Sequence, residues 1–142
     1  MIHDLSVQEF VQLIKKGEKK FTGVSVEDFN FTLRNYDLEG VEFEDCFINI
    51  NLEKCNLKNA KFIFCNLKTI SVRDCSIENC YISDCHIESI IITGKNIDQI
   101  VFGTNYAYGM TLSPEKCLIY VRNEILKVHK FELTLYSLEI DF

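Results

Sequence analysis

An apolar residue recurs every five positions through the middle of the chain, and this spacing constrains the fold more than any other feature. A helix repeats every 3.6 residues and a strand every two, so neither element fits a period of five. The chain must therefore bend once in each five-residue block. Fifteen such positions, with one four-residue step, run through residues 31 to 104: Leu33, Leu38, Phe43, Ile48, Leu52, Leu57, Phe62, Leu67, Val72, Ile77, Ile82, Ile87, Ile92, Ile97 and Phe102.

A second set of positions lies two residues before the first and holds six of the seven cysteines. Two inward residues separated by one outward residue make a minimal strand, and the other residues of the block supply a turn. Each block is therefore predicted to form one short side of a polygon. The second set is Tyr36, Val41, Cys46, Ile50, Cys55, Ala60, Cys65, Ile70, Cys75, Cys80, Cys85, Ile90 and Ile100.

A longer period of twenty residues relates some of these positions. Ile50, Ile70 and Ile90 are twenty apart, and so are Cys55 and Cys75. Twenty residues correspond to four sides per coil, so fifteen blocks predict about 3.75 coils and a rod about 18 Å tall at one strand spacing per coil. The same register predicts that one side is built on Phe43, Phe62, Ile82 and Phe102.

Several blocks match a known consensus, with a small residue two positions before Leu, Phe or Ile: CNLKN (55 to 59), AKFIF (60 to 64), CNLKT (65 to 69) and CSIEN (75 to 79). The pattern resembles the pentapeptide-repeat family, which implies a right-handed quadrilateral β-helix. The predicted fold class is therefore an all-β solenoid of about four coils, with an N-terminal capping helix and a C-terminal extension. Lys95 at an inward position and the short block 46 to 49 depart from the pattern and predict local bulging or a partner for the Lys95 ammonium.

The flanks of the repeat are expected to cover its open strand edges, which would otherwise invite association. Ser6 and Glu9 fit a capping box, and an apolar stripe at helical spacing follows, so a helix near 6 to 16 is predicted to cover the first coil. We divide the chain into a capping helix (1–20), the repeat (21–112) and a C-terminal capping or dimerisation segment (113–142).

Two structures fit the start of the C-terminal segment. Ser113 and Pro114 are typical of a helix start, and that helix would run to about residue 128, but residues 118 to 121 suit a strand equally well. Apolar and polar residues alternate through 131 to 135 and, after a slip, to Phe142. The last twelve residues are therefore predicted to form strands.

Composition limits the location and the partners of the chain. The 142 residues are 47% apolar with a net charge of -6, no apolar run is long enough for a membrane span, and the first residues lack a signal-peptide pattern. We expect a cytoplasmic protein with no membrane contact. The acidic balance also argues against direct binding of nucleic acid, which requires Lys and Arg at the phosphates.

The residues that could carry chemistry do not form a recognisable site. The cysteines follow steps of five, which places neighbours on different sides of the coil, so we interpret them as reduced, buried thiols and expect no metal and no cofactor. His86 should point outward while Cys85 points inward, which separates the one His and Cys pair. The chain is therefore expected not to be an enzyme.

Two groups of outward residues are candidate interaction sites. The first is an acidic surface of Asp37, Glu39, Glu42, Glu44 and Asp45, for which a solvated face is the simplest interpretation. The resemblance implies an alternative, a DNA-mimicking regulator of a type II topoisomerase such as gyrase. However, residues 31 to 104 carry eleven acids against seven bases, and Lys58 interrupts one acidic column.

The second group is an apolar patch of Ile63, Phe64, Tyr81 and Val101, all on the side built on Phe62. An exposed cluster of this kind marks an interface, and the chain's own tail, a second copy or another protein could cover it. The leading hypothesis is a non-catalytic scaffold for protein–protein interaction or self-association. Its partner is then an unidentified protein or a second copy bound through the C-terminal segment.

Overall fold

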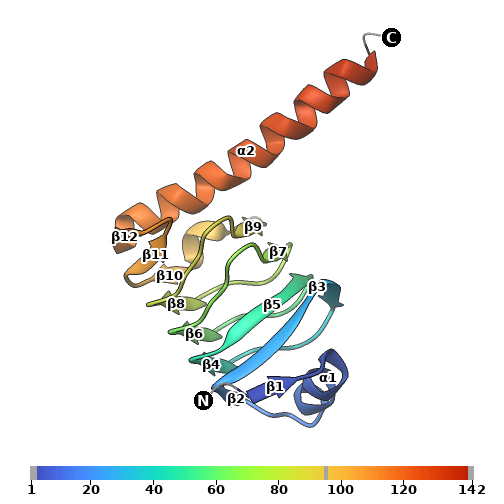
Figure 1. The fold of residues 1–142 in the computed structure, drawn as a ribbon, viewed down its shortest axis with the longest axis vertical. Helices are drawn as coiled ribbons and strands as arrows, with labels where there is room; N and C mark the ends of the chain where they lie inside the picture. The colour runs from blue at the N-terminus through green and yellow to red at the C-terminus, as the bar shows by residue number, and fades with distance from the viewer. Residues whose placement is uncertain (1–2, 95, 141–142) are drawn as a thin grey trace.

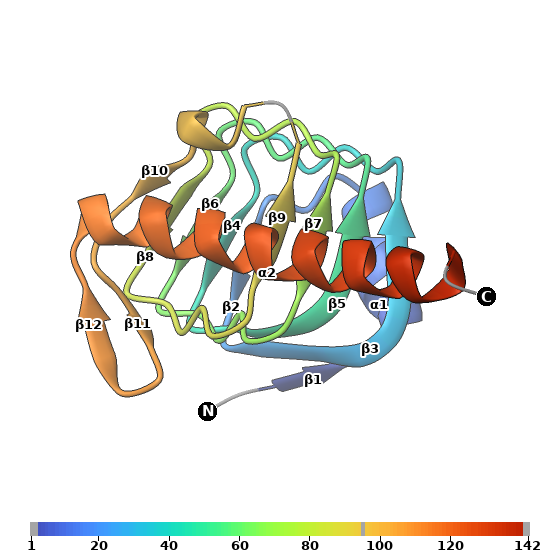
Figure 2. The ribbon, with the colours of Figure 1, turned by 90° about the horizontal axis from the view of Figure 1, so that it is seen from above.

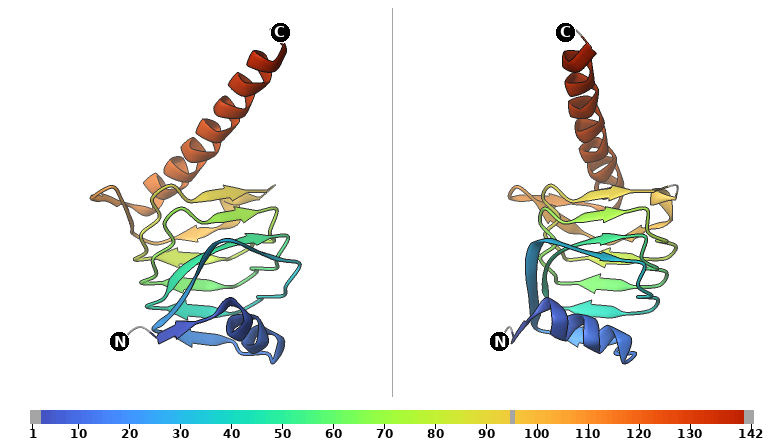
Figure 3. Two further views of the ribbon diagram at one scale, coloured as in Figure 1. Left: turned by 45° about the vertical axis from the view of Figure 1, so that its right-hand side comes forward. Right: turned by 90° about the vertical axis from the view of Figure 1, so that its right-hand side faces the viewer.

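The computed structural model of the chain describes residues 3–94 and 96–140 (Figure 1). Within these ranges, side chains are described except at 128–129 and 131–140. Stacked short strands form a body that has one helix at each end, and the C-terminal helix runs away from it (Figures 1 and 3).

The strands form two five-stranded parallel sheets and one antiparallel pair. The first sheet has the order β1-β3-β5-β7-β9, and the second has the order β10-β8-β6-β4-β2. The first contains β1 (His3–Leu5), β3 (Val24–Arg34), β5 (Phe47–Glu53), β7 (Ser71–Arg73) and β9 (Ile91–Thr93). The second contains β2 (Lys20–Thr22), β4 (Glu42–Glu44), β6 (Lys61–Ile63), β8 (Tyr81–Ser83) and β10 (Val101–Phe102).

The chain alternates between the two sheets, so each pass adds one strand to each of them. We call one such pass a layer. Lys61 pairs in register with Tyr81, and Ser71 pairs with Ile91, so neighbouring layers are twenty residues apart in the regular region. The predicted twenty-residue period is confirmed, as is the column of Phe43, Phe62, Ile82 and Phe102.

The predicted fold class is wrong. Instead of an all-β solenoid, a quadrilateral β-helix, the described chain forms two separate parallel sheets, a small antiparallel sheet and two α-helices. After β5, which spans the blocks of both Ile48 and Leu52, only every second block becomes a strand. The blocks of Leu57 and Leu67 contribute only isolated bridges at Asn56 and Asn66. Parallel strands in separate sheets, together with the helices, make this a mixed α and β fold. A five-residue spacing dictates where the chain bends but not which segments pair.

The interior is a continuous apolar core built from the two predicted sets of inward positions. Phe10, Phe21, Phe43 and Phe62 form a ladder of rings whose successive centroids are 5.3, 5.3 and 4.9 Å apart. The turns between strands need a left-handed backbone, and eleven non-glycine residues among those described have positive φ, six of them Asn or Asp. Asn and Asp tolerate this conformation better than other side chains, so the turn chemistry agrees with the repeat.

The four-residue step of the sequence lies inside β5, which alternates buried and half-buried residues without a break. The mismatch in spacing appears in its partner β3, where the pairing register with β5 shifts between Glu27 and Thr32. The bulging predicted from the short block therefore occurs in the neighbouring strand. Lys95, the other predicted departure, lies outside the described residues.

The N-terminal helix α1 (Val7–Lys15) forms as predicted. The Ser6 hydroxyl accepts a hydrogen bond from the Glu9 N–H, and the Glu9 carboxylate accepts one from the Ser6 N–H, both at 3.1 Å. Phe10 and Ile14 of α1 are buried, with Phe10 against Phe21 and Phe43.

The C-terminal end departs from the parallel stacking. A 3-10 turn (Ile97–Gln99) precedes β10, and β11 (Asn105–Ala107) and β12 (Met110–Leu112) then form an antiparallel hairpin. Helix α2 (Pro114–Ile140) follows. Of the two alternatives left open from residue 113, the helix is the one observed.

The strands predicted for the last twelve residues are wrong over 131 to 140, while 141 and 142 lie outside the described residues. Extending an existing helix costs far less free energy than nucleating a new element, and this outweighs the local alternation. Neither helix of the described chain combines the length and the apolar character needed to cross a membrane.

Candidate interaction surfaces

The structure places the predicted apolar patch on the outer face and edge of the second sheet. Tyr81 pairs in register with Val101 on one side and with Lys61 on the other, while Ile63 lies two residues beyond Lys61 in β6 and pairs with Ser83. Phe64 follows Ile63 at the turn. Phe64 is 60% and Val101 47% exposed, so the described part of the chain leaves the patch open.

The five predicted acidic residues divide into two groups. The first group, Asp37, Glu39 and Glu42, makes contacts within the body, and the second, Glu44 and Asp45, lies beside the apolar patch. Asp37 accepts hydrogen bonds from the Glu39 N–H at 3.0 Å and from the Asn56 amide at 3.2 Å, so it supports a turn and the next layer. Glu42 lies 3.7 Å from the Lys61 ammonium.

Glu44 and Asp45, in contrast, adjoin the apolar patch. Glu44 pairs in register with Ile63, and the Asp45 N–H donates to the Ile63 carbonyl at 3.0 Å. The two predicted sites therefore meet at one edge of the second sheet. Whether either of them binds a partner stays a prediction.

Opposite charges alternate between layers on the lateral surface. Four ion pairs join neighbouring layers: Arg34–Glu53 at 3.5 Å, Lys58–Glu78 at 4.0 Å, Lys61–Glu42 at 3.7 Å and Lys68–Glu88 at 3.2 Å. Exposed pairs of this type each contribute less than about 1 kcal/mol to stability. Their consequence for recognition is larger, because they interrupt the single-sign columns that a mimic of DNA would present.

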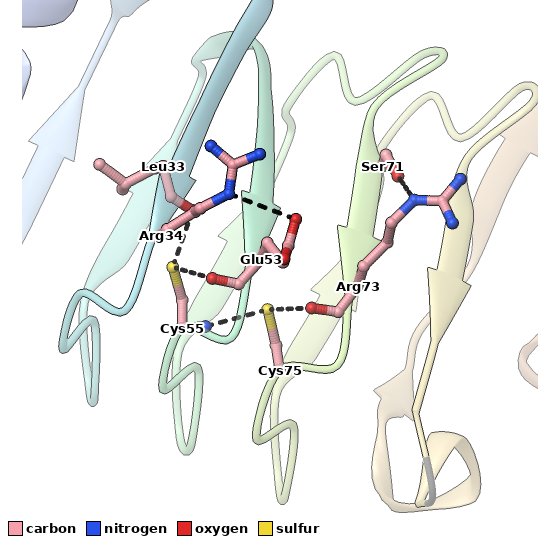
Figure 4. Close-up of polar contacts among 7 residues, drawn as sticks. All are labelled: Leu33, Arg34, Glu53, Cys55, Ser71, Arg73 and Cys75. Carbon is pink, nitrogen blue, oxygen red and sulfur yellow. Dashed lines mark hydrogen bonds and ion pairs between the residues drawn. The ribbon is translucent and has the colours of Figure 1, made fainter.

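The seven cysteines are buried free thiols. Figure 4 shows Cys55 and Cys75 side by side in successive layers, where the Cys55 N–H donates to the Cys75 sulfur at 3.4 Å. The Cys55 thiol in turn donates to the Leu33 carbonyl of the layer before, at 3.3 Å. The thiols thus link layers through the backbone.

The environment of the thiols argues against nucleophilic catalysis. The contact between the two side chains lowers the pKa of Cys55 and raises the pKa of Cys75. Cys55 is only 1% exposed, however, so a substrate cannot reach its sulfur. Burial raises the pKa of Cys80 to about 12. His86 is exposed and lies beside Tyr106 rather than a thiol.

No group of three or more His, Cys, Asp or Glu side chains among the described residues is arranged to hold a metal ion. Stacked cysteines in a column point the same way, whereas a metal site needs ligands that converge.

Helix α2 presents two different faces. Cys117, Val121 and Glu124 are buried against the body, which α2 contacts at β9, β10 and β12. Ile119 and Leu126, seven residues apart and therefore on one face, are 58% and 59% exposed. The described part of the chain does not cover this second face.

The same spacing continues in the sequence, where Leu133 and Ile140 follow Leu126 at intervals of seven. The helix itself continues past Glu124 and leaves the body (Figures 1 and 3). Figure 2 shows that it crosses over the end of the stack on its way out. Two exposed apolar residues of α2 thus begin a heptad spacing that the sequence continues.

Asn105 is a structural residue that the sequence analysis missed. It is fully buried, its carbonyl oxygen accepts from the Cys85 N–H at 2.9 Å, and its amide donates to the Ile82 carbonyl at 3.0 Å. It occupies the place that Cys85 has one layer earlier, twenty residues before. Extending the twenty-residue period by one more step would have found it.

A polar cluster holds α2 on the last layer. The Tyr120 hydroxyl accepts from the Ser89 N–H at 2.9 Å, and the Tyr108 N–H donates to the Glu88 carboxylate at 2.8 Å. Desolvation alone would raise the pKa of Glu88, but the Tyr108 N–H and the Lys68 ammonium together lower it. Of these contacts, the hydrogen bond between Ser89 and Tyr120 joins α2 to the last layer.

Comparisons with known proteins leave the family open. No family model, curated protein or solved structure matches the chain. The resemblance to pentapeptide-repeat proteins therefore stays a prediction, and the surfaces described above carry the argument about function.

Proposed function

We propose that the protein is a non-catalytic scaffold that associates with a second copy of itself through α2 and presents the lateral face of its second sheet to another protein. The single observation that carries this proposal is the exposure of Ile119 and Leu126, one heptad apart on a helix that extends beyond the body. Apolar residues at heptad spacing supply one of the two apolar positions of a helix-pairing seam, while the positions three and four residues after Ile119 are the polar Arg122 and Asn123.

The free energies of burial and association favour a dimer contact along most of α2. Burying Ile119 and Leu126 in both copies would yield at most about 6 to 12 kcal/mol. Association costs an estimated 4 to 15 kcal/mol, so these two positions alone would give a weak dimer. Leu133 and Ile140, which continue the spacing in the sequence, would supply the remainder.

The test is the solution mass of the full chain by light scattering. We expect a dimer, and we expect the double variant Ile119→Lys with Leu126→Lys to be a monomer with an unchanged unfolding midpoint. Phe29→Lys is the matched control, because it places the same charge at an exposed apolar residue of β3, outside α2. A monomeric full chain, or a double variant that keeps the dimer mass, contradicts the proposal.

The non-catalytic part of the proposal rests on the burial of every thiol. Native protein treated with iodoacetamide should stay unmodified, whereas the unfolded chain should react at all seven cysteines. Rapid alkylation of Cys55 in the native state would argue instead for a reactive cysteine. A cytoplasmic location belongs to the same proposal, since free thiols fit a reducing compartment.

The alternative function, a DNA-mimicking regulator of gyrase, stays a prediction. The pairing of Lys58 with Glu78 weighs against it, because Lys58 places positive charge within an acidic column, and Lys61 adds another positive charge beside Glu42.

A further inference from the structure

One turn of each layer contributes a residue to a short column at the edge of the second sheet. The Asp45 N–H donates to the Ile63 carbonyl at 3.0 Å, the Phe64 N–H to the Ser83 carbonyl at 3.1 Å, and the Asp84 N–H to the Thr104 carbonyl at 2.7 Å. Asp45, Phe64 and Asp84 therefore occupy the same turn in three successive layers. Phe64 stands between the two aspartates.

Phe64 is an energetically unfavourable residue at this turn position. Its φ of 54° lies in the left-handed region, where a bulky side chain is an outlier, and its ring is 60% exposed. The equivalent positions above and below it are aspartates with φ of 54° and 56°. An Asn or Asp at position 64 would suit the backbone better, so the fold does not require the aromatic ring.

The Asp45 and Asp84 carboxylates, in the turns on either side of Phe64, are not neutralised by a positive side chain of the described residues. Within the described residues, neither Asp45 nor Asp84 takes part in an ion pair, and Asp84 accepts only a hydrogen bond from the Ser83 hydroxyl at 3.0 Å. One layer spacing, about 4.8 Å, separates each carboxylate turn from that of Phe64. The face of an aromatic ring attracts cations, and nearby carboxylates add to that attraction.

We propose that Asp45, Phe64 and Asp84 bind an arginine side chain of a partner protein, with an apolar neighbour of that arginine on Ile63, Tyr81 and Val101. A guanidinium can stack on the ring while it donates to a carboxylate, which an ammonium does less well. This surface lies on the lateral face, and of its residues only Val101 belongs to a strand that α2 contacts. It extends the proposed function without depending on self-association.

The probe is the peptide acetyl-Gly-Val-Arg-Val-Gly-amide, titrated into the isotopically labelled full chain and followed by NMR. Its control has citrulline, an uncharged group of the same shape, in place of arginine. We expect shifts at Phe64, Asp45 and Asp84, with about fivefold weaker binding of the citrulline peptide. Binding should also weaken when salt is raised, because the site is exposed.

Three variants separate the contributions. Phe64→Asn should weaken arginine-peptide binding about fivefold while its unfolding midpoint stays equal or rises, since Asn tolerates a left-handed backbone. Asp45→Asn and Asp84→Asn should each weaken binding about twofold to fivefold. Phe29→Asn is the control, because Phe29 is 68% exposed elsewhere on the molecule and should leave binding unchanged.

Other outcomes would overturn the proposal. Equal binding of the two peptides would make the patch merely apolar, and a lower midpoint for Phe64→Asn would make the ring structural. A loss of dimer mass in Phe64→Asn would mean that a second copy occupies this surface. A monomeric full chain that still binds the arginine peptide would refute the self-association and leave this site intact.

Discussion

The two ends of the body are covered by helices of very different length. Helix α1 has nine residues and buries Phe10 and Ile14 against the first layers. Helix α2 has 27 residues, but Cys117, Val121 and Glu124, its buried side chains among those described, all lie in its first eleven. A short helix is enough to cover one end, so the remaining length of α2, on the order of 24 Å, serves another purpose.

The ends also differ in the chemistry that holds the helix. At the N-terminal end the contact is apolar, with Phe10 at 5.3 Å from Phe21 between ring centroids. At the C-terminal end Cys117 and Val121 also join the apolar core, but hydrogen bonds are added to this contact, from the Ser89 N–H to the Tyr120 hydroxyl at 2.9 Å and from the Asn105 amide to the Cys117 sulfur at 3.6 Å. Apolar contacts are tolerant of direction, whereas hydrogen bonds specify an angle. A helix that must project in one direction gains from the second kind of contact.

Removing the apolar anchor of α1 should have the largest effect. Phe10→Ala is expected to destabilise the protein by about 3 to 5 kcal/mol, because the ring is 1% exposed and its loss leaves a cavity beside Phe21 and Phe43. Urea unfolding measures the change, and Phe29→Ala, at a 68% exposed position, should change stability by less than about 0.5 kcal/mol. A near-neutral Phe10→Ala would mean that α1 is not held by the ring ladder.

Removing the polar anchor of the other end should cost somewhat less. Asn105→Ala leaves the Cys85 N–H and the Ile82 carbonyl without their partner, at an expected cost of about 2 to 4 kcal/mol. Asn105→Cys should cost less, since the Cys85 sulfur accepts from the Cys65 N–H in the layer before. Equal losses in the two variants would show that the amide is not the essential group.

The residues that precede the two helices should differ less in their contribution to stability. Ser6→Ala removes the capping box of α1 and should destabilise by about 1 kcal/mol. The Ser113 hydroxyl makes no hydrogen bond within the described chain, and α2 begins at Pro114, so Ser113→Ala should stay within about 0.5 kcal/mol. Thermal unfolding of both variants tests this, and a larger effect at Ser113 would reverse the comparison.

The smallest effect concerns pH. The lowered pKa of Glu88 means that its contacts contribute stability that is fully present above the ordinary carboxyl pKa of about 4.3 and is lost as the pH falls through the lower folded value. Wild type and Glu88→Gln should therefore differ by less than about 1 kcal/mol at pH 7 and converge at low pH. Glu78→Gln, in the more exposed pair with Lys58, should differ less at pH 7. A stability difference between wild type and Glu88→Gln that grows at low pH would contradict the lowered pKa of Glu88.

The candidate surfaces were predicted unevenly. Ile63, Phe64, Tyr81 and Val101 came from the twenty-residue register, and the structure places them on one face. Their proximity to Glu44 and Asp45 followed from the same register but was overlooked. The exposed face of α2 could not be predicted, because the alternation in residues 131 to 135 is compatible with a strand.

Local spacing determined the bends, the inward positions and the capping box of α1, because each depends on residues only a few positions apart. The twenty-residue period also determined the parallel register of neighbouring layers. Only the tertiary structure decided how those segments divide into two sheets and an antiparallel hairpin, and that the last segment continues as a helix beyond the body. Those choices depend on pairing and burial between segments far apart in the chain, which a local pattern does not encode.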